Sequence, residues 1–377
     1  MTVIERLDVF PLRVPLDHPY GSARGLIPAR QLTLVRLTTS DGAIGWGEGY
    51  GTPAVVAAAV EDLAPTVRGR ELDPPGPWAA RILQQGYHNG DGGALFSAVS
   101  AVDTATWDAL GHTLGRSVGR LLGGRARDHV TAYASTGFTT ETRDLDEFTE
   151  MVRSGVEAGF PAAKIKLGVG FPEDRRRAEA ARTALDPDRA MMIDLNGNCT
   201  ADVAAATVAR LRDLDPYWVE EPVPPQDLPG LREIRPLGVP VAIGEALYGR
   251  QSFREPIAAR LTDIVQPDVA KVGGLTEARA VTELARAFGV RVSPHCWGGA
   301  IAQAATLQLL AALPPYPHVD NPPEKLWFEL DRSYNPLRDE LITEPFTARD
   351  GRIDIPDLPG LGVTVDEAAL RAFRLDR

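Results

Sequence analysis

From residue 128 onward, two kinds of segment alternate regularly, and this alternation constrains the fold more than any other feature of the sequence. Short β-branched or apolar runs, typical of buried strands, are separated by stretches with apolar residues at helical spacing, such as 199–214 and 275–289. Eight runs are expected to be strands: 130–136, 162–167, 190–195, 217–222, 239–245, 263–268, 290–295 and 326–330. Strands separated by helices predict an α/β protein, and eight such strands predict a (β/α)8 TIM-type barrel.

The segments on either side of this region have different patterns of apolar and polar residues. Residues 1–50 alternate apolar and polar side chains around a hairpin signal at Ser40-Asp41-Gly42, and 53–122 have helical spacing. The region after 331 is rich in Pro and Gly and has no strong period. We therefore predict three parts: an α+β capping domain (1–125), a catalytic barrel (126–330), and a C-terminal segment (331–377) that packs back on the cap.

Composition excludes several classes of protein. The net charge of -11 repels phosphate backbones, so no nucleic acid partner is expected. No run approaches the roughly 18 apolar residues that span a bilayer, and the N-terminus has acidic residues and no apolar signal region, so no membrane association is expected. Two cysteines, Cys199 and Cys296, cannot form a disulfide framework, which favours a cytoplasmic location.

Polar residues stand at the ends of successive predicted strands. From Lys166 to His295 they recur every 23 to 28 residues, the length of one βα unit. The set, completed by the eighth strand, is Lys166, Asp194, Glu220, Glu245, Asp268, His295 and Glu329. One such residue alone is often a helix N-cap. A full series at the carboxyl ends of barrel strands predicts an active site in one mouth of the barrel.

Three carboxylates from adjacent strands form the predicted metal site. Asp194, Glu220 and Glu245 would repel one another unless a cation lay between them, and oxygen-only ligands favour Mg²⁺. The alternative is a buried carboxylate–arginine network without metal. Glu221 is expected to point the opposite way from Glu220 in a regular strand and to be structural.

Lysine is rare in this chain, so each lysine is a candidate for a role that arginine performs poorly. Only four of the 40 basic residues are lysines: Lys164, Lys166, Lys271 and Lys325. Lys164 and Lys166 share one face of a strand beside the predicted metal, so the pKa of Lys166 is expected to fall towards neutrality and make it a base. Lys164 is expected to bind a substrate carboxylate, and Lys271 to pair with a metal-ligand carboxylate.

Asp268 and His295 end neighbouring strands and predict a dyad in which the carboxylate fixes the imidazole tautomer. The alternative for His295 is a core histidine bonded to a carbonyl. Asn196 shares the face of Asp194 and is a candidate substrate donor. A protonated Glu329 would hydrogen-bond the substrate carboxylate. Together these groups predict removal of a proton next to a carboxylate, because cationic groups offset the charge of an enediolate.

Specificity is expected from segments around the barrel mouth. The loop HPYGSARG (18–25) offers His18, Tyr20 and Arg24 to substrate hydroxyls or a distal carboxylate, and the alternative is a plain surface loop. The stretch 46–50 is expected to flank the same pocket. Ser135 and Thr136, at the end of the first barrel strand, are further candidate substrate contacts.

Nearly the whole chain resembles the enolase superfamily, and within it the mandelate racemase subgroup. The resemblance rests on SAVSAVDTATWDALGHTLGRSVGRLLGG (97–124), AKIK, MIDLNGN, VEEP, IGE, DIVQPDVAKVGGLTEA and SPHCWG. It implies a modified (β/α)7β barrel, Mg²⁺ at the three carboxylates, and a homo-oligomer. It also implies Lys166 as a base on one face of the substrate and the His295–Asp268 dyad on the other.

The resemblance leaves the reaction open. Most of the subgroup resembles acid-sugar dehydratases, in which His295 would protonate the departing 3-hydroxyl of an aldonate or aldarate to give a 2-keto-3-deoxy acid. The alternatives are a racemase or epimerase of a 2-hydroxy acid, a hydroxyproline-type dehydratase, or a non-enzymatic carboxylate-binding barrel. The segment before Glu329 is longer than in the racemase, so Asp320 is the alternative residue for its role.

Overall fold

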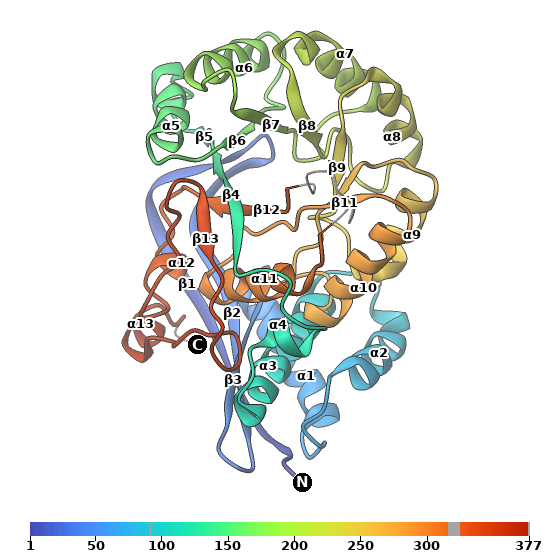
Figure 1. The fold of residues 1–377 in the computed structure, drawn as a ribbon, viewed down its shortest axis with the longest axis vertical. Coiled ribbons are helices and arrows are strands. Elements are labelled where there is room, and N and C mark those ends of the chain that lie inside the picture. Colours follow the sequence, from blue (N-terminus) through green and yellow to red (C-terminus); the bar gives the residue numbers. More distant parts are fainter. Residues whose placement is uncertain (91, 316–324, 376–377) are drawn as a thin grey trace.

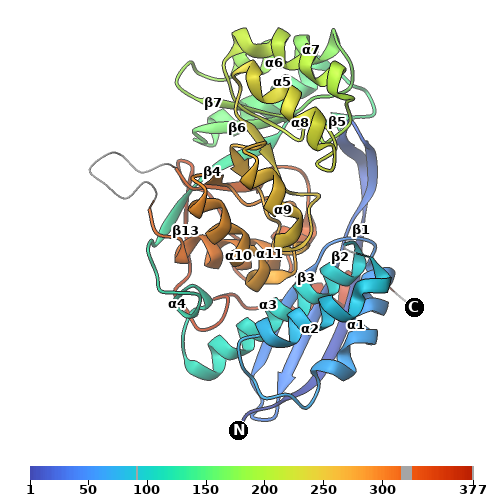
Figure 2. The same cartoon turned by 90° about the vertical axis from the view of Figure 1, so that its right-hand side faces the viewer.

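The N-terminal part of the chain is a twisted antiparallel sheet covered by helices. The structure is a computed structural model that describes residues 1–90, 92–315 and 325–375. The sheet has the order β3-β2-β1-β5, with β1 (Ile4–Ser22), β2 (Gly25–Thr39), β3 (Ile44–Gly49) and β5 (Thr139–Thr140). The long hairpin of β1 and β2 rises from the cap along the side of the barrel and reaches β5 (Figure 2).

The helices of the N-terminal part are α1 (Pro53–Val67), α2 (Gly76–Gln85), α3 (Ala94–Leu114) and α4 (Val118–Leu121), with a 3-10 turn η1 (Gly86–Asn89). Helices α1 and α3 pack on this sheet, α2 packs against them, and α4 packs against α3 and the later helix α11 (Ala300–Ala312). The long helix α3 lies so close to β3 that a Cβ atom at Gly47 would come within 1.8 Å of the Ala101 carbonyl oxygen. Glycine is therefore required at this strand position for the helix to approach the sheet.

In the described part of the chain, eight parallel strands form the central sheet, as the sequence predicts, and a ninth strand pairs antiparallel at β4 (Figure 1). The parallel strands are β4 (His129–Thr136), β6 (Ala162–Lys166), β7 (Ala190–Asp194), β8 (Pro216–Glu220), β9 (Val241–Ile243), β10 (Ile264–Val265), β11 (Arg291–Val292) and β12 (Trp327–Asp331). Neighbours from β6 to β11 follow chain order, and β4 lies between β6 and β12.

Seven helices connect these strands. They are α5 (Leu145–Glu157), α6 (Glu173–Ala184), α7 (Ala201–Leu211), α8 (Leu228–Ile234), α9 (Gly249–Ala258), α10 (Gly274–Ala287) and α11 (Ala300–Ala312), with 3-10 turns η2 (Arg212–Leu214) and η3 (Arg235–Leu237). After β12, the described chain contains only the short helices α12 (Pro336–Asp339) and α13 (Glu367–Ala372) and the strand β13 (Arg352–Asp354). The architecture is the modified (β/α)7β barrel with an α+β cap, which confirms the predicted fold class.

An apolar layer fills the barrel below the predicted site. Tyr133, Trp218 and Trp327 form a separate buried cluster with Met192 and Ile264, and the Tyr133 and Trp218 rings meet edge to face at 5.7 Å. Side chains two residues further along a strand point the same way. The apolar layer therefore forms the floor beneath the polar side chains that end the strands.

The C-terminal segment contacts both the cap and the barrel. The backbone N–H of Leu375 donates to the Pro11 carbonyl oxygen at 2.9 Å, and Glu367 pairs with Arg36 at 3.3 Å. Strand β13 also pairs with β4, so this segment covers the barrel as well as the cap. The boundaries at 125 and 330 stay a prediction.

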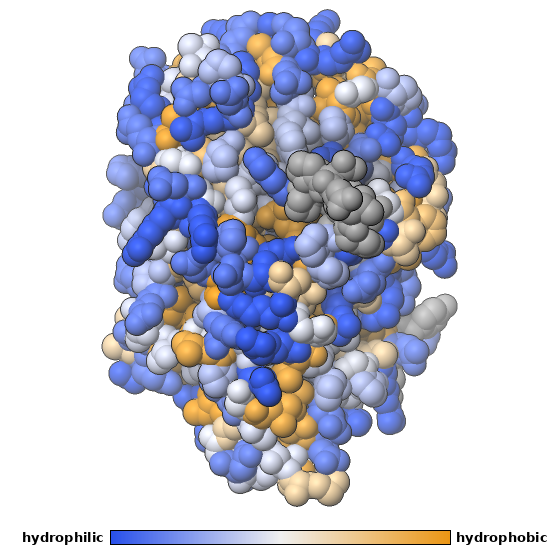
Figure 3. Space-filling view, viewed as in Figure 1, coloured by the Kyte–Doolittle hydropathy of each residue, from blue (hydrophilic) through white to orange (hydrophobic). Residues whose placement is uncertain are grey.

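Hydrophilic residues dominate the face of the molecule shown in Figure 3, and apolar residues are scattered between them. Among the described residues, no helix combines the length and apolar character needed to cross a membrane.

Candidate active site

The carboxyl ends of the barrel strands bring the three predicted metal ligands together. Asp194 and Glu220 are fully buried, and one carboxylate oxygen each from Asp194, Glu220 and Glu245 lies within 4.8 Å of the others. Gly244, just before Glu245, has a φ of 147° and ends β9. The predicted set of three carboxylates is thus a single cluster, here called the acidic trio.

Neutral donors hold all three members of the acidic trio in place. The indole N–H of Trp218 and the side-chain amide of Gln266 donate to Oε2 of Glu220, at 3.1 and 2.6 Å. The side-chain amide of Asn196 donates to Oδ2 of Asp194 at 3.1 Å and to Oε1 of Glu245 at 3.3 Å. Asn196 therefore orients two trio carboxylates, and its predicted role as a substrate donor stays a prediction.

The donor chemistry of the trio fits a hard divalent cation. Burial, together with the charges of Asp194, Glu329 and Glu245, raises the pKa of Glu220 to about 7, although Lys164 lowers it. Oε2 of Glu245 is buried and accepts no hydrogen bond among the described residues. Crowded anionic oxygens suit Mg²⁺, which prefers oxygen ligands.

Lys164 lies beneath the trio as a fully buried ammonium. Its Nζ is 2.6 Å from Oε1 of Glu220, 2.8 Å from Oε1 of Glu329 and 3.8 Å from Oδ2 of Asp194. Burial lowers the pKa of Lys164, but Glu220 and Glu329 raise it well above its usual value. Lys164 is therefore held as a positive charge by two carboxylates.

Lys166 lies at the edge of the trio, with Nζ 2.5 Å from Oδ2 of Asp194. Burial and Lys164 lower its pKa, but Asp194, Glu245 and Glu220 outweigh them and raise it above the usual value. With the protein's own charges alone, three carboxylates outweigh one neighbouring ammonium. The predicted fall of this pKa included a nearby Mg²⁺ and stays a prediction. A fall requires a cation that neutralises the trio.

The Asp268–His295 pair has the predicted geometry. Nδ1 of His295 is 2.7 Å from Oδ2 of Asp268, and Nε2 is 3.2 Å from Oε2 of Glu245. Burial lowers the pKa of His295, but Glu245, Glu329 and Asp268 raise it to about 9. The Asp268 carboxylate is itself held by the backbone N–H of Ala270 at 2.8 Å. His295 thus contacts the trio at Glu245, whereas Lys166 contacts it at Asp194.

Glu329 is in the predicted place but in a different ionisation state. Burial raises its pKa, but Lys164, His295 and Lys166 lower it far more, so the carboxyl group is ionised. The prediction of a protonated Glu329 is therefore wrong with the protein's own charges, because Lys164 pairs with it. Asp320, the alternative for this role, lies outside the described residues.

Two residues expected to be structural partners depart from expectation. Glu221 has a φ of 38°, so it ends the strand and the alternation that would turn it away from Glu220 does not apply. Burial and the charges of Glu245, Asp194 and Glu220 raise its pKa well above the usual value. Its carboxyl group is therefore close to the trio.

Lys271 does not pair with a trio carboxylate. Its Nζ lies over the rings of Tyr50 and Tyr248, at 4.9 and 5.6 Å from their centroids, and no ion pair within 4.0 Å is present among the described residues. The predicted ion pair is wrong, and a cation–π contact takes its place.

The segment 18–25 is the tip of the β1–β2 hairpin, not a surface loop. Tyr20 is buried and its hydroxyl donates to the Tyr334 carbonyl oxygen at 2.9 Å. Arg24 reaches across to the end of β7 and donates to the Asn196 carbonyl oxygen at 3.1 Å. His18 is exposed, next to an irregularity between Pro15 and Tyr20. The hairpin tip therefore covers the barrel mouth, but these contacts join protein to protein.

Ser135 and Thr136 lie on opposite faces of β4. Ser135 pairs in register with Lys164 and Asp331, and its buried hydroxyl has no partner among the described residues. Thr136 donates to the Met151 carbonyl oxygen at 2.9 Å, in α5. Neighbouring strand residues cannot both face the barrel interior. Ser135 therefore remains a candidate substrate contact, and the same prediction for Thr136 is wrong.

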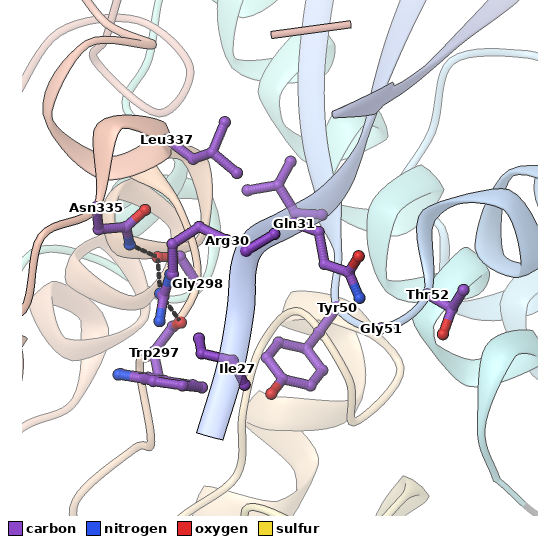
Figure 4. Close-up of a pocket in the computed structure, with 12 residues that line it drawn as sticks. Ile27, Arg30, Gln31, Tyr50, Gly51, Thr52, Trp297, Gly298, Asn335 and Leu337 are labelled. Atoms are coloured by element: carbon purple, nitrogen blue, oxygen red, sulfur yellow. Dashed lines mark hydrogen bonds between the residues drawn. The ribbon is translucent and has the colours of Figure 1, made fainter. Parts of the chain in front are cut away.

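A cavity of about 200 Å³ lies beside Trp297 and Gly298, which follow His295 in the chain (Figure 4). Its lining includes Arg30, Tyr50, Trp297 and Asn335, and the Arg30 guanidinium lies 4.1 Å from the centroid of the Trp297 ring. Tyr50 belongs to the stretch expected to flank the pocket.

Sequence analysis missed Arg30, Trp218 and Gln266. Gln266 and Trp218 each stand two positions before a predicted site residue, so strand alternation could have identified both. Arg30 has no such signal, because its partners lie more than 260 residues further along the chain.

Known proteins match this chain along almost its full length. Residues 6–123 match the mandelate racemase / muconate lactonizing enzyme N-terminal domain, and residues 147–369 match the enolase C-terminal domain-like family. The D-galactarolactone cycloisomerase of Agrobacterium fabrum is 37% identical over 363 residues, 96% of each chain. The D-gluconate dehydratase of Thermoproteus tenax is 32% identical, over 91% of this chain and 70% of its own.

A solved structure adds a match in three dimensions. The L-talarate/galactarate dehydratase of Salmonella typhimurium, liganded with Mg and L-lyxarohydroxamate, has a TM-score of 0.87 and 26% identity. The alignment covers 100% of this chain and 93% of that one.

The capped (β/α)7β barrel and its acidic trio define an enzyme of the enolase superfamily, to which this chain belongs. Within the superfamily it is a member of the mandelate racemase subgroup. Its relatives include dehydratases and a cycloisomerase of acid sugars or their lactones.

Proposed function

We propose that this enzyme uses Mg²⁺ to remove the α-proton of a sugar acid, an aldonate or aldarate, and then eliminates the 3-hydroxyl as water. The product is a 2-keto-3-deoxy acid. The observation that carries the proposal is that Lys166 contacts the acidic trio at Asp194, while His295 of the dyad contacts it at Glu245. A base and an acid at separate points of a carboxylate-binding site suit an elimination.

The trio Asp194, Glu220 and Glu245 would hold the Mg²⁺. When bound, the ion offsets the negative charge that develops on the substrate carboxylate. Lys164, fixed by Glu220 and Glu329, adds a permanent positive charge below the same position. Both charges favour the transition state over the ground state, because charge on the carboxylate grows as the proton leaves.

Lys166 would take the proton from the α-carbon, and the electron pair of that C–H bond would move into the enediolate. The pair then forms the C2–C3 double bond as the C3–O bond breaks. His295, whose pKa is raised to about 9, is protonated at neutral pH and would give its Nε2 proton to the leaving oxygen. The resulting enol becomes the ketone when C3 takes a proton and the C2 hydroxyl releases one, so the net change is the loss of one water.

A cycloisomerase is the second candidate, and the 37% identity to the D-galactarolactone cycloisomerase favours it. The chemistry differs only in the leaving group. If the β-oxygen belongs to a ring, elimination opens the ring and no atoms leave. The same base and acid would then give an isomer of the substrate.

A substrate panel in D2O tests the proposal. Purified enzyme with Mg²⁺ is incubated with aldonates, aldarates and their lactones, and products are read by semicarbazide assay and mass spectrometry. A keto acid lighter by one water, apart from one deuterium taken up at C3, supports dehydration, and a keto acid with the mass of the substrate plus that deuterium supports cycloisomerisation. Deuterium in recovered substrate without product indicates a racemase or epimerase. Binding without exchange or product contradicts the proposal. The cytoplasmic location and the homo-oligomer are further proposals that this panel does not address.

A further inference from the structure

The two barrel helices that follow the dyad strands are capped by the N-terminal domain. Helix α11 begins at Ala300, soon after His295, and α10 begins at Gly274, soon after Asp268. Neither helix receives a capping hydrogen bond from its own N-cap side chain, whereas α5 is capped by its own Asp144. Unsatisfied N–H groups at a buried helix start need partners, and here the cap supplies them.

Glu48 of β3 caps α11. Its two carboxylate oxygens accept hydrogen bonds from the backbone N–H of Gly299 at 2.7 Å and of Ala302 at 2.9 Å. The side chain is only 2% exposed. Burial raises the pKa of Glu48 to about 7 in spite of these two donors, so the fold keeps a carboxyl group here against a desolvation cost.

The chain between His295 and α11 is fitted around this carboxylate. A Cβ atom at Gly298 would lie 2.4 Å from Oε1 of Glu48, so any other residue would push the two apart. The same segment is held at its carbonyl groups, because Arg30 donates to the Trp297 carbonyl oxygen at 2.6 Å and Asn335 to that of Gly298 at 3.0 Å. The position of His295 is thus fixed from the α11 side.

A similar set of hydrogen bonds from the cap holds the turn between Asp268 and α10. Ser100 of α3 accepts hydrogen bonds from the backbone N–H of Gly273 and Gly274, each at 2.9 Å, and Asp103 accepts one from Thr276 at 3.1 Å. Both partners of the dyad are therefore followed by a turn that cap side chains hold. This repetition argues that the contacts do more than join two domains.

We propose that Glu48 is a positioning residue, which sets the His295 imidazole against Asp268 by holding the start of α11. Glu48 does not touch the dyad directly; it acts through the backbone of residues 298–302. Loss of one acceptor would let this segment move, and a shift of about 1 Å at a catalytic group costs on the order of 100-fold in rate. The kinetic part of this proposal rests on the proposed function, and the structural part does not.

The test uses Glu48→Gln, which keeps the volume but replaces one acceptor oxygen with an NH2 group that repels a helix N–H. Glu367→Gln is the matched control, because it removes an exposed carboxylate that joins the cap to the C-terminal segment. With ¹⁵N-histidine-labelled full-length protein and Mg²⁺ at one fixed pH, we expect Glu48→Gln to shift the His295 ring signals and Glu367→Gln to leave them unchanged. Unchanged His295 signals in Glu48→Gln would overturn the proposal.

A kinetic readout separates positioning from general damage. With a sugar acid that is turned over in the panel, Glu48→Gln should slow elimination about tenfold or more, while exchange of the α-proton at Lys166 changes less than twofold. Equal loss of both would indicate a merely structural role. If Glu48→Gln does not fold, Glu48→Asp replaces it in the same experiment, because aspartate keeps both oxygens but is one methylene shorter. A shift of the His295 ring signals in Glu48→Asp supports the proposal, and unchanged signals overturn it. If no sugar acid reacts, the proposed function is contradicted. The His295 NMR signals still test the positioning role of Glu48, because they do not require turnover.

Discussion

Nζ of Lys166 lies 2.5 Å from Oδ2 of Asp194, so the proposed base is bonded to a proposed metal ligand. Because the Asp194 carboxylate contacts Lys166 and also belongs to the proposed metal site, the pKa of Lys166 depends on the charge of the acidic trio. A cation that takes up the negative charge of Asp194 lowers the pKa of Lys166, because the ion pair that stabilises the ammonium weakens. Metal binding and base strength are therefore expected to change together.

Removal of the metal should abolish turnover and leave the fold in place. Lys164 and Lys166 already neutralise part of the trio, so the chelated protein retains ion pairs at the site. We expect EDTA to lower kcat by about 100-fold or more and Mg²⁺ to restore it, because metal charge stabilisation is worth several kcal/mol. Circular dichroism checks the fold. Full activity in excess EDTA would contradict the assignment of the trio.

Substitution of the base should remove exchange of the α-proton. Lys166→Ala is expected to lower the exchange rate by about 10² to 10⁴ for substrates whose α-proton faces the lysine. Lys325→Ala is the control, since Lys325 is exposed and its Nζ lies over the Trp327 ring, away from the trio. NMR in D2O follows the exchange. Equal rates in the two variants would show that another group removes the proton.

Substitution of the acid should separate the two halves of the reaction. His295→Asn leaves Lys166 intact, so α-proton exchange continues while elimination falls by about 10² or more. Asp268→Asn should have a similar effect, because Nδ1 of His295 loses the carboxylate that fixes its tautomer at 2.7 Å. Loss of exchange together with elimination in both variants would assign the first step to the dyad.

The raised pKa of His295 predicts a change of stability with pH. Its pKa in the folded protein is about 9, and a histidine in the unfolded chain titrates near about 6.5. The protonated imidazole therefore stabilises the fold fully below the unfolded value. This contribution, roughly 3 kcal/mol at most, is lost as pH rises towards 9.

Urea unfolding in EDTA from pH 6 to 10 measures this loss. The wild-type protein should lose stability between about pH 6.5 and 9, and His295→Asn should lack that decline. Parallel declines in the two proteins would mean that His295 is not the group responsible.

Strand-end residues were the most predictable part of the site. A barrel forces the carboxyl ends of its strands into one mouth, so Asp194, Glu220 and Glu245 could be placed together from spacing alone. The fold class followed from the same alternation of strands and helices. These predictions hold because barrel geometry leaves few other arrangements.

Predictions that depended on local backbone or on distant partners were less successful. Glu221 does not follow the strand alternation because its φ is positive, and the sequence does not indicate this backbone conformation. Thr136 could have been assigned to the helix side by alternation with Ser135. The ionisation of Glu329 depends on Lys164, which comes from another strand at 2.8 Å. The contact of Glu48 with α11 spans about 250 residues and has no local signal.

A crystal soaked in Mn²⁺ tests the central claim most directly, because anomalous scattering locates the ion. The account predicts one strong peak bound by carboxylate oxygens of Asp194, Glu220 and Glu245, with Lys166 beside it. No peak at the trio, with Lys164 and Lys166 still paired to Glu220 and Asp194, would contradict it.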